Sequence, residues 1–329
     1  MIKHYFATAL LAIASLGSAA AMAQEKPVTF RFGHTHPATD SQHVAAQEFA
    51  KRVEERSNGK IKIRVFANGA LGNDNTLVTG VRSGTIDIGV TGNPFLTGIS
   101  PNLNVLDLPY LFNDEKHAFQ VLDGPIGRGL LDDLDNYGLK GLAFWDIGFR
   151  NITNNKHPIQ TAADISGLKI RTTPNPAHIK AFELLGANPQ PMAFTEVYTA
   201  LESGALDGQE NPATLILSSK MYEVQKYLSM TRHAYTAALL FMNKRKFDKL
   251  SPENQKMLLE EALTAANHER DLNAKHQETA LKELREHGVE VNENPDVESI
   301  RKIAKGPVHA EFAKKQGDKI LNAIVAAQQ

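Results

Sequence analysis

The sequence VTFRFG at residues 28–33 alternates apolar and polar side chains, as a half-buried β-strand does, and KIKIRVF at residues 60–66 repeats the pattern. Between these two segments, residues 41–57 carry apolar side chains at helical spacing. A second predicted helix at residues 73–82 leads into a third predicted strand, IDIGVT, at residues 86–91. The alternation of strands and helices predicts an α/β fold in which a mostly parallel sheet is covered by helices.

The loops that follow these predicted strands are candidates for a binding site. Sheets of this kind bind ligands in a crevice at the carboxyl ends of their strands, where the order of the strands reverses. We therefore expect the loops after Gly33, Phe66 and Thr91 to contribute to the site.

A second series of strands and helices predicts a second lobe with its own sheet, since the chain is longer than one hydrophobic core usually serves. A strand-like segment at residues 235–243 then returns the chain to the first lobe. We expect two hinge strands that cross between the lobes near Gly148 and Tyr235, with the binding site between the lobes. The elements predicted for the second series are a strand at 141–145 with a turn to Arg150, a strand at 168–171, helices at 176–185 and 196–202, and a strand at 205–207. The expected lobes are residues 24–148 with 236–265, and residues 149–235 with 266–329.

The C-terminal part of the chain contains a clear helix start. Ser251 suits the N-cap, Pro252 the first helical position and Glu253 the first turn. Neither Gly nor Pro follows before Gly288, which predicts one helix long enough to outreach either lobe. Two helices separated by an unmarked kink are the alternative, because most helices in globular proteins are shorter.

The first 23 residues have the pattern of a secretory signal. A short basic start precedes an apolar run from Tyr5 to Leu16, and Ala21-Met22-Ala23 provides an A-x-A cleavage site. We expect cleavage after Ala23 and export. A retained membrane anchor is the alternative, although the apolar run is short for a membrane-spanning helix.

The charge balance and the lack of cysteine exclude several classes of function. The chain has 36 Lys and Arg against 37 Asp and Glu, so it has no basic field for nucleic acid. It contains no cysteine, which excludes disulfides, thiolate catalysis and cysteine-ligated metal. For an exported protein, this composition is most typical of the bacterial periplasm.

Two arginines, Arg150 and Arg171, lie in strand-and-turn sequence and are followed by DGQENP at residues 207–212. A guanidinium group offers paired N–H donors that match a carboxylate, and it stays charged at physiological pH. The arrangement predicts a receptor for a small anion. The alternatives are an ordinary surface or ion-paired arginine and, for Arg150, a pairing with Asp146.

Other polar and aromatic residues are further candidates for contact with the ligand. Asp74 and its neighbours suit either a helix N-cap or a contact with ligand hydroxyl groups. Asn93, Asn175 and Asn211 can both donate and accept hydrogen bonds, as a polyol ligand requires. Phe194 stacks on the ligand or, like most aromatic residues, belongs to the core.

A cluster of histidines indicates a rival function. His34, Thr35 and His36, with Asp40 and His43 nearby, loosely match the first half of a zinc hydrolase site. The spacing departs from a tight H-x-H-x-D-H ligand set. A periplasmic metal-dependent hydrolase therefore remains a remote alternative.

Many short motifs are spread along the chain: FRFG (30–33), NGKI (58–61), LGND (71–74), GTID (84–87), LPYLF (108–112), GLKIR (167–171), GANP (186–189), EVY (196–198) and DGQENP (207–212). Together they resemble the extracytoplasmic solute receptors of tripartite ATP-independent periplasmic (TRAP) transporters, the DctP family. The resemblance covers nearly the whole mature chain and implies a two-lobed receptor that closes on an organic anion. It also implies delivery of that anion to a small and a large membrane subunit.

The resemblance also assigns roles to individual residues. It implies that Arg171 holds the ligand carboxylate, that Arg150 assists it, and that Asn211 caps the pocket. The remaining expected ligand contacts are Thr35 or His36, Asp74, Asn93, Thr173, Asn175 and Phe194.

Within the family the sequence looks most like the sugar-acid receptors of the 2,3-diketo-L-gulonate type. The sequence looks less like a sialic-acid receptor, because Gly92 stands where that subgroup has an acidic residue. We expect an aldonate or keto-aldonate of about four to six carbons, whose hydroxyl groups both donate and accept. We expect no catalysis, no cofactor and a monomer. A C4-dicarboxylate receptor, in which Arg150 takes a second carboxylate, is the main alternative, and a purely structural exported protein is a further one.

Overall fold

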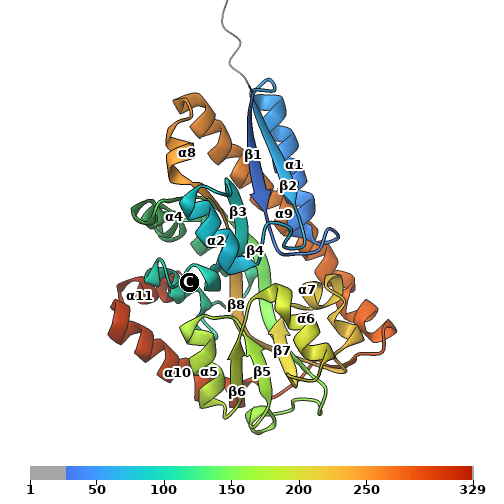
Figure 1. Ribbon diagram of the computed structural model, residues 1–329. Helices are drawn as coiled ribbons and strands as arrows, with labels where there is room; N and C mark the ends of the chain where they lie inside the picture. The colour runs from blue at the N-terminus through green and yellow to red at the C-terminus, as the bar shows by residue number, and fades with distance from the viewer. Residues whose placement is uncertain (1–26, 328–329) are drawn as a thin grey trace, which may run out of the picture.

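A single sheet of nine strands forms the centre of the protein (Figure 1). The structure is a computed structural model that describes residues 27–327, and the predicted signal sequence lies outside them. The strand order is β2-β1-β3-β8-β4-β7-β5-β6, with β9 paired to β8. The strands are β1 (Val28–Gly33), β2 (Ile61–Phe66), β3 (Ile88–Gly92), β4 (Leu139–Asn154), β5 (Lys169–Thr172), β6 (Asn188–Pro191), β7 (Gly208–Asn211), β8 (Tyr227–Asn243) and β9 (Glu290–Asn292).

The sheet divides into two parallel halves, one in each lobe, that are joined by two long antiparallel strands. β1 pairs in parallel with β2 and β3, and β5 pairs in parallel with β6 and β7. β4 and β8, of 16 and 17 residues, pair with each other and extend from one half into the other. The two predicted sheets are therefore continuous. Phe149 of β4 and Tyr235 of β8 face each other in this pair.

One predicted turn is wrong, because residues 139–154 form one strand without a turn before Arg150. Every residue of β4 except Lys140 is buried, as expected for a strand covered on both faces. Gly148, read as a turn residue, lies at a register shift between Asp146 and Gly148, and its φ is +113°. Such bulges redirect a strand without ending it. The strand predicted at 205–207 begins later, as β7.

Helices cover both faces of the sheet (Figure 1). The predicted long C-terminal helix is confirmed as a single helix of 35 residues, α9, whose N-cap is Ser251. The α-helices are α1 (Ser41–Arg56), α2 (Asp74–Ser83), α3 (Glu115–Asp123), α4 (Pro125–Asp133), α5 (Pro176–Leu184), α6 (Phe194–Glu202), α7 (Ala213–Ser218), α8 (Lys244–Asp248), α9 (Pro252–Glu286), α10 (Val297–Gln316) and α11 (Lys319–Ala326). The 3₁₀ helices are η1 (Asn93–Phe95), η2 (Pro101–Asp107), η3 (Leu134–Tyr137), η4 (Ala162–Ile165) and η5 (Met221–Glu223).

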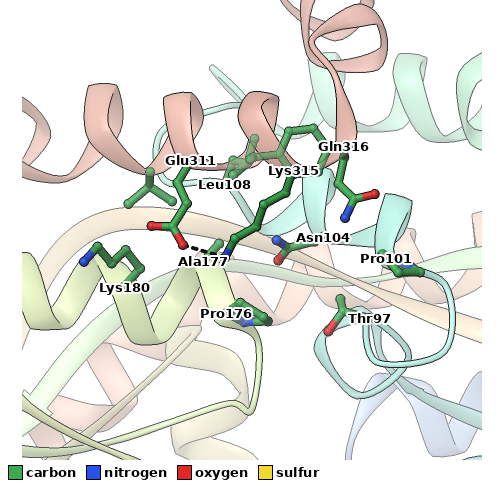
Figure 2. Close-up of a pocket in the computed structure, with 12 residues that line it drawn as sticks. Thr97, Pro101, Asn104, Leu108, Pro176, Ala177, Lys180, Glu311, Lys315 and Gln316 are labelled. Atoms are coloured by element: carbon green, nitrogen blue, oxygen red, sulfur yellow. Dashed lines mark hydrogen bonds and ion pairs between the residues drawn. The ribbon is translucent and has the colours of Figure 1, made fainter.

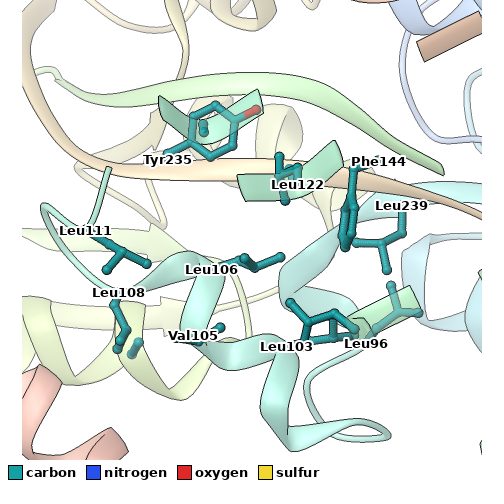
Figure 3. Packing of buried hydrophobic residues seen from close by; sticks show 14 of the residues in the cluster. Leu96, Leu103, Val105, Leu106, Leu108, Leu111, Leu122, Phe144, Tyr235 and Leu239 are labelled. Carbon is teal, nitrogen blue, oxygen red and sulfur yellow. The ribbon is translucent and has the colours of Figure 1, made fainter. Parts of the chain in front are cut away.

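The largest core lies between the long strands and the segment that contains η1 and η2. Leu103 and Leu106 of η2 pack in one cluster with Phe144 of β4 and Leu239 of β8 (Figure 3). On the opposite face, α1 and α9 form a second core with β1 and β4, in which Trp145 is fully buried. None of the helices within residues 27–327 is both long and apolar enough to cross a membrane.

Candidate functional site

A cavity of about 310 Å³ lies between the two halves of the sheet. Both halves contribute to its wall, and so do the two strands that join them. Its position follows from the sheet, because Gly92, Arg171 and Asn211 stand at the carboxyl ends of β3, β5 and β7. The cavity is lined by His36, Asp74, Gly92, Pro94, Phe95, Ile147, Arg150, Arg171, Thr173, Phe194, Asn211, Leu215 and Thr236.

Arg150 is paired inside the protein with Glu210 of β7. Its Nε donates to Oε2 of Glu210, and its Nη2 donates to Oε1 at 2.9 Å and to the main-chain oxygen at 2.5 Å. His233 Nε2 lies 3.2 Å from the same carboxylate. Burial raises the pKa of Glu210, but the charge of Arg150 and these hydrogen bonds outweigh it, so the pKa is well below its usual range. The pairing with Asp146 considered from the sequence does not occur, and the positive charge of Arg150 is balanced.

Arg171 is buried without a carboxylate partner. Only 1% of its surface is exposed, and its Nε and Nη2 donate to the main-chain oxygen of Met192 at 3.1 and 2.7 Å. Its Nη1 donates to no residue of the described chain, and no carboxylate within residues 27–327 comes within ion-pair distance. Burial lowers the pKa of Arg171 to about 10, so the side chain remains charged at neutral pH. A buried charge of this kind is costly unless an anion pairs with it.

Asp74 connects the two halves at the edge of the cavity. Its Oδ1 accepts hydrogen bonds from Thr35 Oγ1 at 2.9 Å and Thr91 Oγ1 at 2.7 Å. Its Oδ2 accepts from the main-chain N–H of Phe194 at 3.0 Å. The N-cap of α2 is the preceding residue, Asn73. Asp74 is thus free of the capping role in its own helix and lies at the cavity instead.

Three of the predicted ligand contacts lie behind the cavity wall. Thr35 bonds to Asp74, as described above. Asn93 Nδ2 donates to Leu103 O at 2.8 Å and to Asp107 Oδ2, and Asn175 Nδ2 donates to Asp107 Oδ2 at 2.7 Å. These amides therefore hold a buried carboxyl group and do not line the cavity.

Asp107, which sequence reasoning missed, sits at the centre of this buried cluster. It is fully buried at the end of η2, and Thr236 Oγ1 lies 3.4 Å from its Oδ1. Burial raises the pKa of Asp107 to about 8, although the Asn93 hydrogen bond and the charge of Arg150 lower it. Asp107 thus keeps its proton at neutral pH. A lone Asp just before Leu108-Pro109 carries no local signal of this role.

Four other predicted residues line the cavity with their side chains held in place. Thr173 Oγ1 lies 2.7 Å from His178 Nδ1, and Asn211 Nδ2 donates to Gln209 Oε1 at 2.6 Å. His36 Nδ1 lies 2.9 Å from Asp40 Oδ1, and its ring lies 5.4 Å from that of Phe194.

Sequence reasoning also missed several residues of the wall. Ile147 and Thr236 come from the joining strands, while Pro94, Phe95 and Leu215 follow β3 and β7. Glu210 had a signal, since it belongs to the quoted DGQENP motif, of which only Asn211 received a role.

The histidines of the first loop bind other protein groups. His34 Nε2 lies 3.0 Å from His43 Nδ1, whereas His36 faces Asp40. Burial lowers the pKa of His34 to about 3, so this imidazole is neutral. Across residues 27–327 no group of three or more His, Asp or Glu side chains is placed to hold a metal ion.

A second cavity, of about 510 Å³, lies between η2, α5 and α10 (Figure 2). Lys315 donates to Glu311 at 2.7 Å across its edge, and Asn104 and Thr97 face it from the segment around η2. None of the predicted ligand contacts lines it. The cavity between the two halves of the sheet is therefore the candidate site.

Comparison with known proteins places the chain in a family. The family model DctP, described as bacterial extracellular solute-binding protein, family 7, matches residues 32–316. The 2,3-diketo-L-gulonate-binding periplasmic protein YiaO of Escherichia coli is 43% identical over 302 residues, which cover 91% of this chain and 92% of that protein.

Two solved structures resemble this protein along most of its length. A TRAP periplasmic solute-binding protein of Polaromonas sp. bound to D-erythronate is 38% identical, with a TM-score of 0.89 over 91% of this chain and 98% of that one. The sugar acid binding protein DctPAm of Advenella mimigardefordensis, in complex with galactonate, is 39% identical, with a TM-score of 0.88 over 92% of this chain and 98% of that one. The chain therefore belongs to the DctP family of TRAP-transporter solute-binding proteins.

Proposed function

We propose that this protein is the receptor of a TRAP transporter for a sugar acid with one carboxylate, an aldonate or keto-aldonate of about four to six carbons, a size range that follows the acids named for its relatives. It binds the acid and releases it unchanged, without catalysis. The observation that carries this proposal is the buried, unpaired guanidinium of Arg171 in the wall of the cavity. A ligand carboxylate supplies the missing anion and accepts from Nη1.

The rest of the wall suits the hydroxyl groups of a sugar acid. Asp74 offers acceptor oxygens, and Asn211, Thr173 and Thr236 offer groups that donate or accept. Phe194, Ile147 and Leu215 provide apolar surface for the carbon chain. The relatives described as binding erythronate, galactonate and diketogulonate support this ligand class.

The charge balance favours one carboxylate over two. A C4-dicarboxylate would need Arg150 for its second carboxylate, but Glu210 already neutralises Arg150. Bringing a second anion next to Glu210 costs electrostatic energy in a buried site. A sugar acid avoids this cost.

The family supports a periplasmic location and delivery of the acid to a small and a large membrane subunit. We propose that the protein is exported with cleavage after Ala23 and acts as a monomer. We also propose that one lobe comprises residues 24–148 with 236–265, and the other residues 149–235 with 266–329. Binding then closes the lobes by hinge motion, because contacts from both lobes are satisfied together only in the closed form.

Thermal unfolding against a panel of acids tests the proposal. The protein is first unfolded and refolded to remove any ligand carried through purification. Free ligand at about 1,000 times its dissociation constant adds roughly 4 kcal/mol to the free energy of unfolding and raises the midpoint by several degrees. We expect the shift with aldonates, and little with succinate, malate or neutral sugars. A shift with dicarboxylates alone would favour the alternative ligand class, and no shift with any acid would contradict the receptor function.

A further inference from the structure

Two carboxylates at the starts of helices link the first half of the sheet to the helices that follow β6 and β7. Asp74 is the first residue of α2, and Asp40 is the N-cap of α1; both are buried. In each, Oδ1 bonds to its own half and Oδ2 accepts from a later part of the chain. Asp40 Oδ1 accepts from Gln42 N at 3.1 Å, and its Oδ2 accepts from Ser218 Oγ of α7 at 2.9 Å.

The contact of Asp74 replaces a missing cap on α6. The N-cap position of α6 is Ala193, which has no side chain able to accept from the free N–H groups of the first turn. Asp74 Oδ2 accepts from the first of these N–H groups, that of Phe194, from the other half of the molecule. A carboxylate at this place also interacts favourably with the positive end of the helix dipole.

The cap contact determines the position of part of the cavity wall. Phe194 lines the cavity, and its ring lies 5.4 Å from that of His36. The main-chain N–H that Asp74 holds belongs to this same residue. Separation of the two halves would therefore break this hydrogen bond and carry Phe194 out of the cavity wall with α6.

We propose that Asp74 is a positioning residue that caps α6 across the cavity and so holds the lobes closed over the ligand. The Asp40–Ser218 hydrogen bond is a second contact that stabilises the closed form. The proposal rests on the proposed function, since it concerns the closed, ligand-bound receptor. These contacts then determine two quantities: the fraction of closed protein at saturating ligand and the rate at which the ligand dissociates.

The distance between the lobes provides a test that separates this role from a simple ligand contact. The chain has no cysteine, so Arg82→Cys on α2 and Glu183→Cys on α5, both exposed positions, accept two spin labels at defined sites. The distance distribution is measured without ligand and with a saturating aldonate. Dissociation rates are measured by stopped-flow on the unlabelled protein.

In the wild-type background we expect saturating aldonate to give one short distance. In Asp74→Ala we expect an open fraction to persist even at saturation and the dissociation rate to rise about tenfold or more, as for a lost charge-assisted hydrogen bond. Asp74→Asn keeps an acceptor for the Phe194 N–H without the charge and should lie between the two. Ser218→Ala removes the hydroxyl group that donates to Asp40, at a position outside the cavity wall. It should raise the dissociation rate by a smaller factor.

Thr91→Val is the matched control, because it removes a hydrogen bond to Asp74 within one half and leaves the contact with Phe194 in place. We expect it to close like the wild type. If Asp74→Ala closes completely at saturation, Asp74 does not hold the lobes together, and a faster release in that variant would then mark a simple ligand contact. If the wild type itself fails to close with any acid, the proposed function fails instead.

Discussion

Glu210 balances the charge of Arg150 inside the protein. Nη2 of Arg150 donates to Oε1 of Glu210 at 2.9 Å and to its main-chain oxygen at 2.5 Å, and both residues are almost fully buried. This pair leaves Arg171 as the cavity arginine whose charge is not balanced by a protein carboxylate within residues 27–327. This difference in charge balance between the two arginines is the basis of the proposed preference for one carboxylate.

Removal of one member of this pair should destabilise the protein strongly. Glu210→Gln leaves the charge of Arg150 buried and unpaired, so we expect a loss of about 3–5 kcal/mol in urea unfolding. The double variant Arg150→Met with Glu210→Gln should recover much of that loss, because no buried charge remains. Asp132→Asn, which breaks the exposed pair with Arg128, should cost less than about 1 kcal/mol. Equal losses in Glu210→Gln and Asp132→Asn would contradict the buried pairing.

The proton on Asp107 should make stability depend on pH. Burial raises its pKa from 3.8 to about 8, so between these values the folded protein holds a proton that the unfolded chain has released. The contribution of this proton is complete below about pH 4 and is lost as the pH rises through about 8.

The Asp107→Asn variant isolates this effect. The free energy of unfolding of this variant is measured in urea at a series of pH values. It should change less with pH than that of the wild type, because the contribution of Asp107 to the pH dependence is missing. The wild type should therefore lose stability relative to the variant from pH 4 to pH 8. A difference between the two proteins that stays constant over this range would show that Asp107 is not protonated in the folded state.

Gly148 should be needed for the bend of β4. Its φ of +113° is unfavourable for any residue with a Cβ atom, whereas the space around that Cβ would be ordinary, with Pro212 Cγ at 3.5 Å. We expect Gly148→Ala to lower the free energy of unfolding by about 1–2 kcal/mol. Gly98→Ala is the control, because no atom lies within 4 Å of its added Cβ. Similar stability of the two variants would argue against strain at the bulge.

The local elements could be predicted well because their signals are local. The strand at residues 28–33 has the predicted bounds, and α1, α2 and α5 end within a residue or two of theirs. The sequence did not decide whether α9 is one helix or two helices separated by a kink. Contacts with α1, β4, α7 and β9 along the helix explain why no kink is needed.

The partners of the site residues could not be predicted, because they depend on strand register. Arg150 and Asp146 are four residues apart, which in a regular strand places both side chains on one face. The register shift between Asp146 and Gly148 removes that relation. Glu210 reaches Arg150 because β7 pairs with β4 near residues 151 and 152, a register that no local pattern encodes.

The side-chain amides show the same limit. Asn93 and Asn175 were expected at the ligand because amides suit a polyol. In the structure their amide nitrogens donate to Asp107, from segments about 80 residues apart in the chain that meet only in the folded structure. Residue type predicted the hydrogen-bonding capacity correctly but not the partner.

Calorimetric titration of the refolded wild type and Arg171→Lys with an aldonate, and with the neutral alditol of the same carbon chain, tests the central claim most directly. We expect the wild type to bind the acid and not the alditol. Lysine keeps the charge but loses the planar pair of donors, so Arg171→Lys should bind the acid about 100-fold more weakly while its circular dichroism spectrum is unchanged. Equal affinity of the wild type and Arg171→Lys for the acid, or equal affinity of the wild type for acid and alditol, would contradict the role of Arg171 as the carboxylate anchor.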